Sequence, residues 1–140
     1  MICHADTIET STGGETDILD LTAAVRDIVA ASGVQTGQAT AMVVGSTAAL
    51  TTLEYEPGLV NHDIAAALEG IAPVDGRYLH EETWHDDNGH SHVRASLIGP
   101  SLALPVVDGA VPLGTWQQIV LIELDTRPRQ RRVVVTVMGG

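Results

Sequence analysis

The chain has 140 residues, of which 44% are hydrophobic, and its 18 acidic and 7 basic residues give a formal net charge of −11 at pH 7. This size predicts one domain over residues 1–140, with enough apolar residues to build a core. The acidic balance excludes nucleic acid and a membrane as partners, because phosphate backbones and anionic lipid surfaces both require clustered Lys and Arg.

The first half of the chain mixes strand and helix patterns. Residues 5–12 partly alternate and predict an edge strand, and a turn follows at 12–15. Thr22 is a good N-cap for a helix with apolar residues at i, i+3 and i+4 spacing, and Gly33 is where that helix stops. Two strands are predicted over 38–46 and 47–55, and a second short helix over 59–68.

The second half predicts strands over 76–84, 91–98, 101–107, 117–125 and 131–138. Asn88-Gly89 is typical of a two-residue hairpin turn and is expected to join the first two of them. The valine-rich last strand requires burial, either centrally in a sheet or at a subunit contact. Together these elements predict an α+β fold, a compact β-sandwich-like domain with two short helices.

Cys3 is the only cysteine, which excludes an intramolecular disulfide and a Cys-rich zinc site. The N-terminal segment lacks the basic and apolar regions of a signal peptide. No apolar run approaches the roughly 20 residues of a membrane span. We therefore expect a cytoplasmic protein.

Four histidines lie close together in the chain: His80, His85, His90 and His92. On the predicted strand, His90 and His92 point to one face, which Arg94 continues, and His80 or His85 on the partner strand would supply a third imidazole. Three imidazoles with an open coordination position suit Zn²⁺ or a similar divalent metal. The alternative interpretation is a solvated, His-rich loop among acidic residues.

Further polar residues each allow two interpretations. Glu54 and Asp63 are either a general base and a group that orients metal ligands, or surface acids at a strand end and a helix start. Ser46 and Thr47, which follow Gly45, either hold an anion with the help of backbone N–H groups or form a plain turn.

Trp116 either stacks on a planar heterocycle or fills a core that contains no Phe, and we expect it to be buried beside the site. Arg127, Arg129, Arg131 and Arg132 either bind phosphate or balance the acidic surface or a neighbouring subunit. No Ser-His-Asp, Cys-His or paired-carboxylate pattern stands out.

Several segments, taken together, resemble the signature of the YjbQ family, and the likeness covers roughly residues 15–138. The segments that carry it are Gly45-Ser-Thr-Ala-Ala-Leu-Thr-Thr-Leu-Glu54, Tyr78-Leu-His80, Asn88-Gly-His-Ser-His92, Ser101-Leu-Ala-Leu-Pro-Val-Val-Asp-Gly109 and Gly114-Thr-Trp-Gln-Gln-Ile119.

This resemblance implies an α+β sandwich that assembles as a homotrimer. It also implies a metal bound by His80, His90 and His92, and a weak thiamine-phosphate synthase activity is attributed to the family. Some members carry a histidine where this chain has Gly45 or Ser46. A ligand or base of those members is therefore missing here.

We accordingly expect a thiamine-phosphate synthase, which joins a pyrimidine-methyl diphosphate to a thiazole phosphate at a divalent metal, Zn or Mg. The alternative is a trimeric metal- or small-anion-binding protein, either a metal-dependent hydrolase or non-enzymatic. Glu54, Asp63 and Arg94 are the expected catalytic residues. The residues expected to bind a small phosphorylated or heterocyclic ligand are Ser46, Thr47, Asn88, Ser101, Trp116 and Gln117.

Overall fold

The computed structural model describes residues 1–140, which form seven strands and four α-helices. The strands are β1 (Ile2–Ser11), β2 (Ile18–Asp20), β3 (Thr36–Val43), β4 (Ala48–Leu53), β5 (Ser101–Val107), β6 (Gln118–Glu123) and β7 (Gln130–Gly139). The helices are α1 (Thr22–Ser32), α2 (Ile64–Ile71), preceded by a π-helical turn η1 (Leu59–Asp63), α3 (Leu79–Trp84) and α4 (Gly89–Ile98). None of these helices has the length and apolar character needed to cross a membrane.

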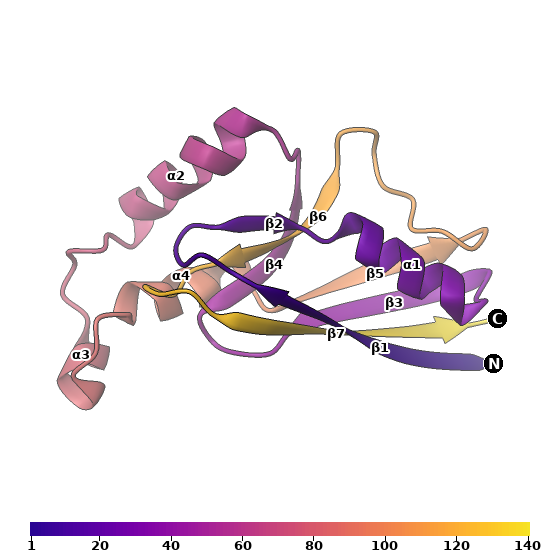
Figure 1. The fold of residues 1–140 in the computed structure, drawn as a ribbon, viewed down its shortest axis with the longest axis horizontal. Helices are drawn as coiled ribbons and strands as arrows, with labels where there is room; N and C mark the ends of the chain where they lie inside the picture. Colours follow the sequence, from indigo (N-terminus) through magenta and orange to yellow (C-terminus); the bar gives the residue numbers. More distant parts are fainter.

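The strands form two antiparallel sheets, one in the order β1-β7-β3-β5 and one in the order β2-β6-β4 (Figure 1). The main core lies between the inner face of the four-stranded sheet, α1 and one face of the three-stranded sheet, with Val135, Val25 and Leu50 as examples from each. A second core covers the other face of the three-stranded sheet, where Leu68 of α2 and Ala95 of α4 pack. The predicted α+β sandwich is thus confirmed, with two more helices than expected.

Strand β7 shows why the strand predictions succeeded. Val133, Val135 and Val137 are fully buried, whereas the intervening Val134 and Thr136 are only partly buried, so side chains alternate between core and surface. β7 pairs with β1 on one side and β3 on the other. The valine-rich last strand is therefore central in its sheet, and β1 is the predicted edge strand.

Two predicted strands, over 76–84 and 91–98, are wrong: both segments contain helices, α3 and α4. Asn88 and Gly89 form no hairpin turn, because Asn88 is the N-cap residue of α4. The buried side chains His90, Ser91, Arg94 and Ala95 recur at helical spacing. The alternation of polar and apolar residues was misleading since here the polar residues are the buried ones.

Two smaller predictions about α1 have different outcomes. Thr22 is the first helical residue rather than the N-cap, which is Leu21, and the Thr22 hydroxyl accepts a hydrogen bond from the Ile119 N–H at 3.0 Å. Gly33 ends the helix in the left-handed conformation with a φ of 74°, as expected of a residue without a Cβ.

The prediction that Trp116 is buried is wrong, because its side chain is 73% exposed in the loop before β6. The core is filled by Val, Ile, Leu and Ala alone.

We therefore expect Trp116→Ala to change the free energy of unfolding by no more than about 0.5 kcal/mol, as at other surface positions. Leu50→Ala is the matched core truncation: Leu50 is 1% exposed, and its loss should cost about 2–5 kcal/mol. Urea denaturation of both variants measures the difference. Equal losses would contradict the exposed position of Trp116.

Candidate functional site

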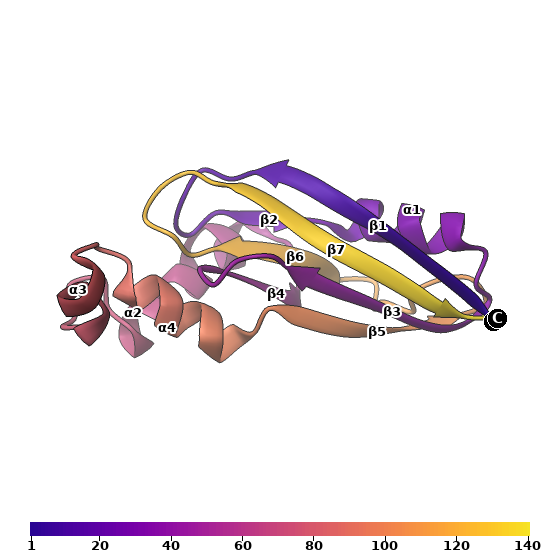
Figure 2. The same cartoon turned by 90° about the horizontal axis from the view of Figure 1, so that it is seen from below.

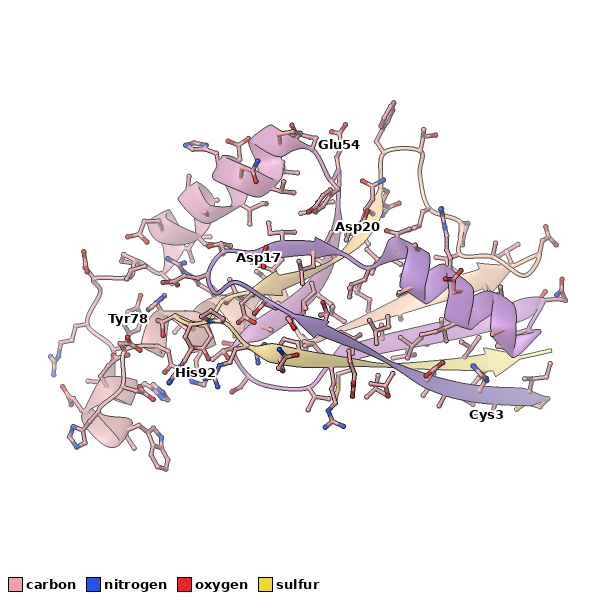
Figure 3. All side chains as sticks on the ribbon, viewed as in Figure 1. Cys3, Asp17, Asp20, Glu54, Tyr78 and His92 are labelled. Atoms are coloured by element: carbon pink, nitrogen blue, oxygen red, sulfur yellow. The ribbon has the colours of Figure 1, made fainter.

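The candidate site centres on two imidazoles, His80 from α3 and His92 from α4, whose ring centroids lie 4.3 Å apart. Nε2 of His80 lies 3.2 Å from Oδ1 of Asp86 and 3.2 Å from the side-chain amide of Asn88. Figure 3 shows His92 and Tyr78 at the end of the molecule where α3 and α4 meet the sheets. Two sequence-predicted metal ligands and one predicted ligand-binding residue are therefore neighbours.

His92 is held in its neutral form. Burial lowers its pKa below the usual value of 6.5, the nearby His80 lowers it further, and Asp86 opposes both effects only in part. Because the imidazole is neutral at pH 7, one ring nitrogen is free to accept a proton or a hydrogen bond.

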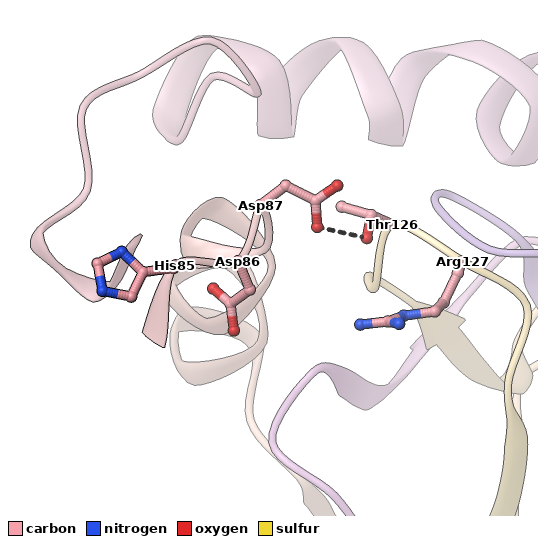
Figure 4. A pocket seen from close by; sticks show the side chains of 5 residues that line it. All are labelled: His85, Asp86, Asp87, Thr126 and Arg127. Carbon is pink, nitrogen blue, oxygen red and sulfur yellow. Dashed lines mark hydrogen bonds between the residues drawn. The ribbon is translucent and has the colours of Figure 1, made fainter. Parts of the chain in front are cut away.

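A polar crevice of about 550 Å³ opens beside this pair (Figure 4). Its lining residues are His85, Asp86, Asp87, Thr126 and Arg127. Thr126 donates a hydrogen bond from its hydroxyl to Oδ1 of Asp87 at 3.1 Å, whereas Arg127 has no carboxylate within ion-pair distance. The guanidinium of Arg127 extends into the crevice and is available to an anionic ligand.

A second crevice, of about 500 Å³, is lined by His92 itself. Most of its other lining side chains are small. Its lining residues are Gly45, Ser46, Ala48, His92, Ala95, Ser96 and Pro100. Ser46, predicted to bind a ligand, therefore shares a crevice with His92.

His90 does not join the other two histidines. It is 1% exposed, and its Nε2 lies 2.7 Å from Oε2 of Glu15, in the turn after β1. The expectation that His90 and His92 share one face is wrong, because it assumed a strand and the segment is the helix α4. On a helix, residues two apart point about 200° apart.

Arg94 is likewise occupied inside the fold. Its Nη2 donates to Glu69 at 2.8 Å, and its Nε donates to the carbonyl of Ala72 at 2.9 Å. Arg94 is 2% exposed. It fastens α4 to the end of α2, so it positions the helix that carries His92 instead of facing a substrate.

The three predicted metal ligands do not fit a single metal ion in this arrangement. No three His, Cys, Asp or Glu side chains gather in a group that would hold one. The alternative third ligand, His85, is an exposed residue with a positive φ of 55° at the end of α3 and lines the polar crevice. Only His80 and His92 remain together.

A buried ion pair lies beneath the site and was missed from the sequence. Nε and Nη2 of Arg131 donate to the two carboxylate oxygens of Glu123 at 2.8 and 2.6 Å. Glu123 is fully buried, and Arg131 also donates to the hydroxyl of Thr47 at 2.8 Å. Thr47, predicted to bind a ligand, is thus part of the interior.

Asp125 forms a second buried ion pair, with Arg129, at 2.6 Å. Burial by itself would raise the pKa of Asp125, but hydrogen bonds from Arg129, the Thr126 N–H and Thr47, with the charge of Arg129, outweigh it and lower the pKa to about 2. The side-chain amide of Asn88 lies 3.4 Å from Oδ1 of the same carboxylate. Asp125 therefore links the sheet to the residue that contacts His80.

The sequence offers only a weak signal for these ion pairs. Glu123 and Asp125 lie at and just after the end of β6, and Arg129 and Arg131 lie just before and at the start of β7. Because β6 and β7 belong to different sheets, no cross-strand register predicts which residues pair. Of the four clustered arginines, these two balance acids within the chain.

Glu54 and Trp116 meet in a separate crevice of about 340 Å³, which Asp20 and Tyr55 also line. Figure 3 shows Asp20 and Glu54 well away from His92. Their predicted roles therefore belong to another surface than the histidine pair.

The remaining predicted residues have local partners. Gln117 closes its own turn by accepting from the Gly114 N–H at 3.1 Å, and its amide donates to Thr52 at 3.0 Å. Asp63 is exposed and pairs with His62 at 2.8 Å. Ser101 is the exposed first residue of β5. None of these three lines either crevice beside His92.

We expect Asp125→Asn to lose about 2 kcal/mol of stability at pH 7, since a carboxylate with a lowered folded-state pKa stabilises the fold above its unfolded pKa. In the unaltered protein this contribution is lost as the pH falls from about 4 to about 2. Urea denaturation between pH 7 and pH 2 measures it. The variant should show a flatter pH dependence in that window, and an unchanged slope would contradict the assignment.

The UPF0047 protein YjbQ-like family model matches residues 6–140. A UPF0047 protein of Methanothermobacter thermautotrophicus is 40% identical over 128 residues, which cover 91% of this chain and 87% of that protein. A UPF0047 protein of Synechocystis is 33% identical over 136 residues, covering 97% and 92% of the two chains.

Solved structures of similar proteins have the same fold as this chain. A YbjQ-like protein of unknown function from Sulfolobus solfataricus superposes with a TM-score of 0.92 at 33% identity, covering 99% of this chain and 98% of the other. A YjbQ/UPF0047 protein from Clostridium acetobutylicum gives a TM-score of 0.85 at 32% identity, covering 95% and 99%. The sandwich is therefore the fold of these relatives as well.

Proposed function

Because the chain belongs to the YjbQ-like UPF0047 family, we propose that it is an enzyme acting on a small phosphorylated heterocycle, with thiamine-phosphate formation as its reaction. The site comprises the His80–His92 pair and the two crevices beside it. The family itself carries no established function that would decide the reaction, so the proposal rests on the geometry of this site and on the resemblance.

One observation carries the proposal: His92 lines the small-residue crevice, and its neighbour His80 contacts Asp86 of the polar crevice, where Arg127 lies beside two carboxylates. A ligand with a planar ring at one end and a phosphate at the other would therefore have both ends accommodated, with its central bonds beside the two imidazoles.

The reaction requires a stabilised leaving group. In thiamine-phosphate formation, the bond between the pyrimidine methylene carbon and a diphosphate oxygen breaks, and its electron pair leaves with pyrophosphate. The ring nitrogen of the thiazole phosphate supplies the pair for the new C–N bond. Arg127 would stabilise the negative charge on the departing pyrophosphate. The neutral His92 would accept a hydrogen bond from the pyrimidine amine.

A divalent metal, Zn or Mg, stays a separate part of the proposal, and no step is assigned to it. Asp86 and Asp87 line the polar crevice, and a diphosphate beside two carboxylates is favoured when a cation accompanies it. We propose His80 and His92 as its ligands, without His90, because these two imidazoles are neighbours.

We expect purified protein to release pyrophosphate only when the pyrimidine-methyl diphosphate and the thiazole phosphate are both present. His92→Ala should lower the rate about 100-fold, because the hydrogen bond that positions the pyrimidine would be lost. Arg127→Ala should lower it as well, whereas Arg26→Ala, at an exposed position of α1, is the matched control that should not. A coupled pyrophosphate assay measures all four proteins.

Release from the diphosphate alone would identify a hydrolase and overturn the synthase. No release under any condition, with zinc or magnesium added, would overturn the enzymatic proposal in favour of a binding protein.

We expect bound zinc, measured by elemental analysis of untagged protein, to be lost in His80→Ala and in His92→Ala and retained in His90→Ala. Retention should also fall at acidic pH, once the pH drops below the lowered pKa of His92, because a protonated imidazole cannot bind a metal ion. His85→Ala is the control for the alternative third ligand. Equal zinc content in all four variants would contradict a metal at the histidine pair.

We also propose that the protein is a homotrimer, as the family resemblance implies. Its mass in solution, measured by light scattering, should be about three times that of the chain.

A further inference from the structure

Asn88-Gly89 is the only Asn-Gly pair in the chain, and such a pair favours a reaction that needs no enzyme. The backbone nitrogen of the residue after an asparagine can attack the side-chain amide carbon and expel ammonia. Glycine in the second position favours this attack, because it has no side chain to hinder the approach. The other asparagine, Asn61, is followed by the bulky His62. The sequence therefore marks Asn88 as the asparagine most prone to lose its amide.

The fold requires glycine at position 89. A Cβ there would lie 2.5 Å from the Cβ of Tyr78 and 2.5 Å from Oε1 of Glu81, closer than a Cβ comes to other atoms in proteins. Tyr78 is the N-cap residue of α3 and Gly89 is the first residue of α4, so the glycine allows the starts of the two helices to pack together. The residue that makes Asn88 reactive is therefore needed for the packing of α3 against α4.

In the folded chain both reacting groups are held by other partners. The Gly89 N–H donates to Oε1 of Glu81 at 2.5 Å, so the nitrogen keeps its proton and is not free to attack. Asn88 is 6% exposed, and its side chain lies 3.2 Å from Nε2 of His80 and 3.4 Å from Oδ1 of Asp125. Burial also keeps out the water that completes the reaction. The native contacts therefore suppress the loss of the amide.

The helix that supplies Glu81 is weakly anchored. α3 has six residues, none of them buried, and no side chain of α3 belongs to either hydrophobic core. In Figures 1 and 2 it lies at one end of the molecule, beyond the strands of both sheets. Segments with few buried contacts open at a lower free-energy cost than the whole fold. We therefore expect α3 to move away from α4 while the two sheets stay folded.

We propose that Asn88 is a self-modification site that the Glu81–Gly89 contact keeps closed. When α3 moves away, the Gly89 nitrogen attacks Cγ of Asn88 and forms a new C–N bond. The bond from Cγ to the side-chain nitrogen breaks, and that nitrogen leaves as ammonia with the proton that the Gly89 nitrogen gives up. One water molecule then opens the cyclic imide, which leaves aspartate or isoaspartate at position 88. The inference goes beyond the proposed reaction and does not depend on it.

The product undoes the contacts around position 88. The Asn88 side chain lies 3.1 Å from Oδ1 of Asp86 and 3.4 Å from Oδ1 of Asp125. A carboxylate in its place adds a third negative charge between two others and removes the amide donors. Because position 88 is the N-cap of α4, which carries His92, the modification loosens the helix that presents this imidazole.

The conversion of amide to acid can be followed on one peptide. Trypsin cleavage after Arg77 and Arg94 yields a fragment in which Asn88 is the only asparagine, and mass spectrometry of this fragment measures the conversion. After incubation of the whole protein at neutral pH, we expect conversion to be at least about tenfold slower in native than in urea-unfolded protein. It should accelerate at urea concentrations below the global unfolding transition, which circular dichroism reports, because α3 opens first.

Two substitutions at one position test the role of Glu81. Glu81→Met keeps the length of the side chain but removes the acceptor, and it should raise the native conversion rate about tenfold, the usual effect of losing one hydrogen bond to a charged group. Glu81→Gln makes the same change in charge but retains an oxygen acceptor, so its rate should stay within about twofold of that of the unaltered protein. Thermal melting shows whether each variant is folded.

Asn88→Asp makes the product directly and tests its consequence. We expect this variant to lower the melting temperature by at least about 3 °C. Asn61→Asp makes the same change in charge at an exposed position of η1 and should leave the melting temperature unchanged. An unchanged melting temperature in Asn88→Asp would overturn the loosening of α4.

Equal conversion in native and unfolded protein would overturn a site that the fold keeps closed. Conversion that begins only with global unfolding would overturn the opening of α3, and equal rates in Glu81→Met and Glu81→Gln would overturn the role of Glu81. The urea series on the unaltered protein decides the proposal even where Glu81→Met does not fold. None of these measurements depends on catalytic activity.

Discussion

Two buried carboxylates, Glu123 and Asp125, hold the site in place. Both carboxylates are fully buried. Asp125 pairs with Arg129, just before β7, and Glu123 pairs with Arg131, near the start of β7. Removing one partner of the Glu123–Arg131 pair, which is buried on both sides, leaves an uncompensated charge in the interior and costs about 3–5 kcal/mol. The Arg129 side chain is 38% exposed, so the loss of Asp125 costs less. Thr47 at the start of β4 bonds both pairs, so the ends of β4, β6 and β7 are fastened at one point. The contact of Asn88 with Asp125 extends this network to the start of α4.

The polar residues of α4 divide their roles because the segment is a helix. His90 and Arg94 point inward, to Glu15 and to the end of α2, and fix the orientation of the helix. His92 points to the crevices and meets His80. Nδ1 of His90 and the hydroxyl of Ser91 are buried without a hydrogen-bond partner, so α4 is held by the His90–Glu15 and Arg94–Glu69 contacts and not by a fully paired network. These two contacts fix the helix that presents the imidazole of His92, which is a requirement for positioning a reacting ligand.

Much of the sandwich could be predicted because apolar side chains alternate clearly with the others, as in β7, where every second residue is buried. The segment 79–98 could not, since its burial pattern rests on His90 and Arg94, which periodicity methods count as surface residues. For the site, clustering in sequence selected His80, His92 and Asn88, which the structure brings together. It failed for His90, because that assignment depended on the strand. It also overlooked Glu123 and Asp125, whose ion pairs form only through tertiary contacts.

Gly45 has a φ of +125° and no room for a side chain, because a Cβ there would lie 2.7 Å from Nη1 of Arg131. A residue at position 45 and the Arg131–Glu123 pair thus compete for one volume. A side chain at position 45 would therefore displace the Arg131 guanidinium and disturb its contacts with Glu123 and Thr47, and the positive φ would strain any residue other than glycine there.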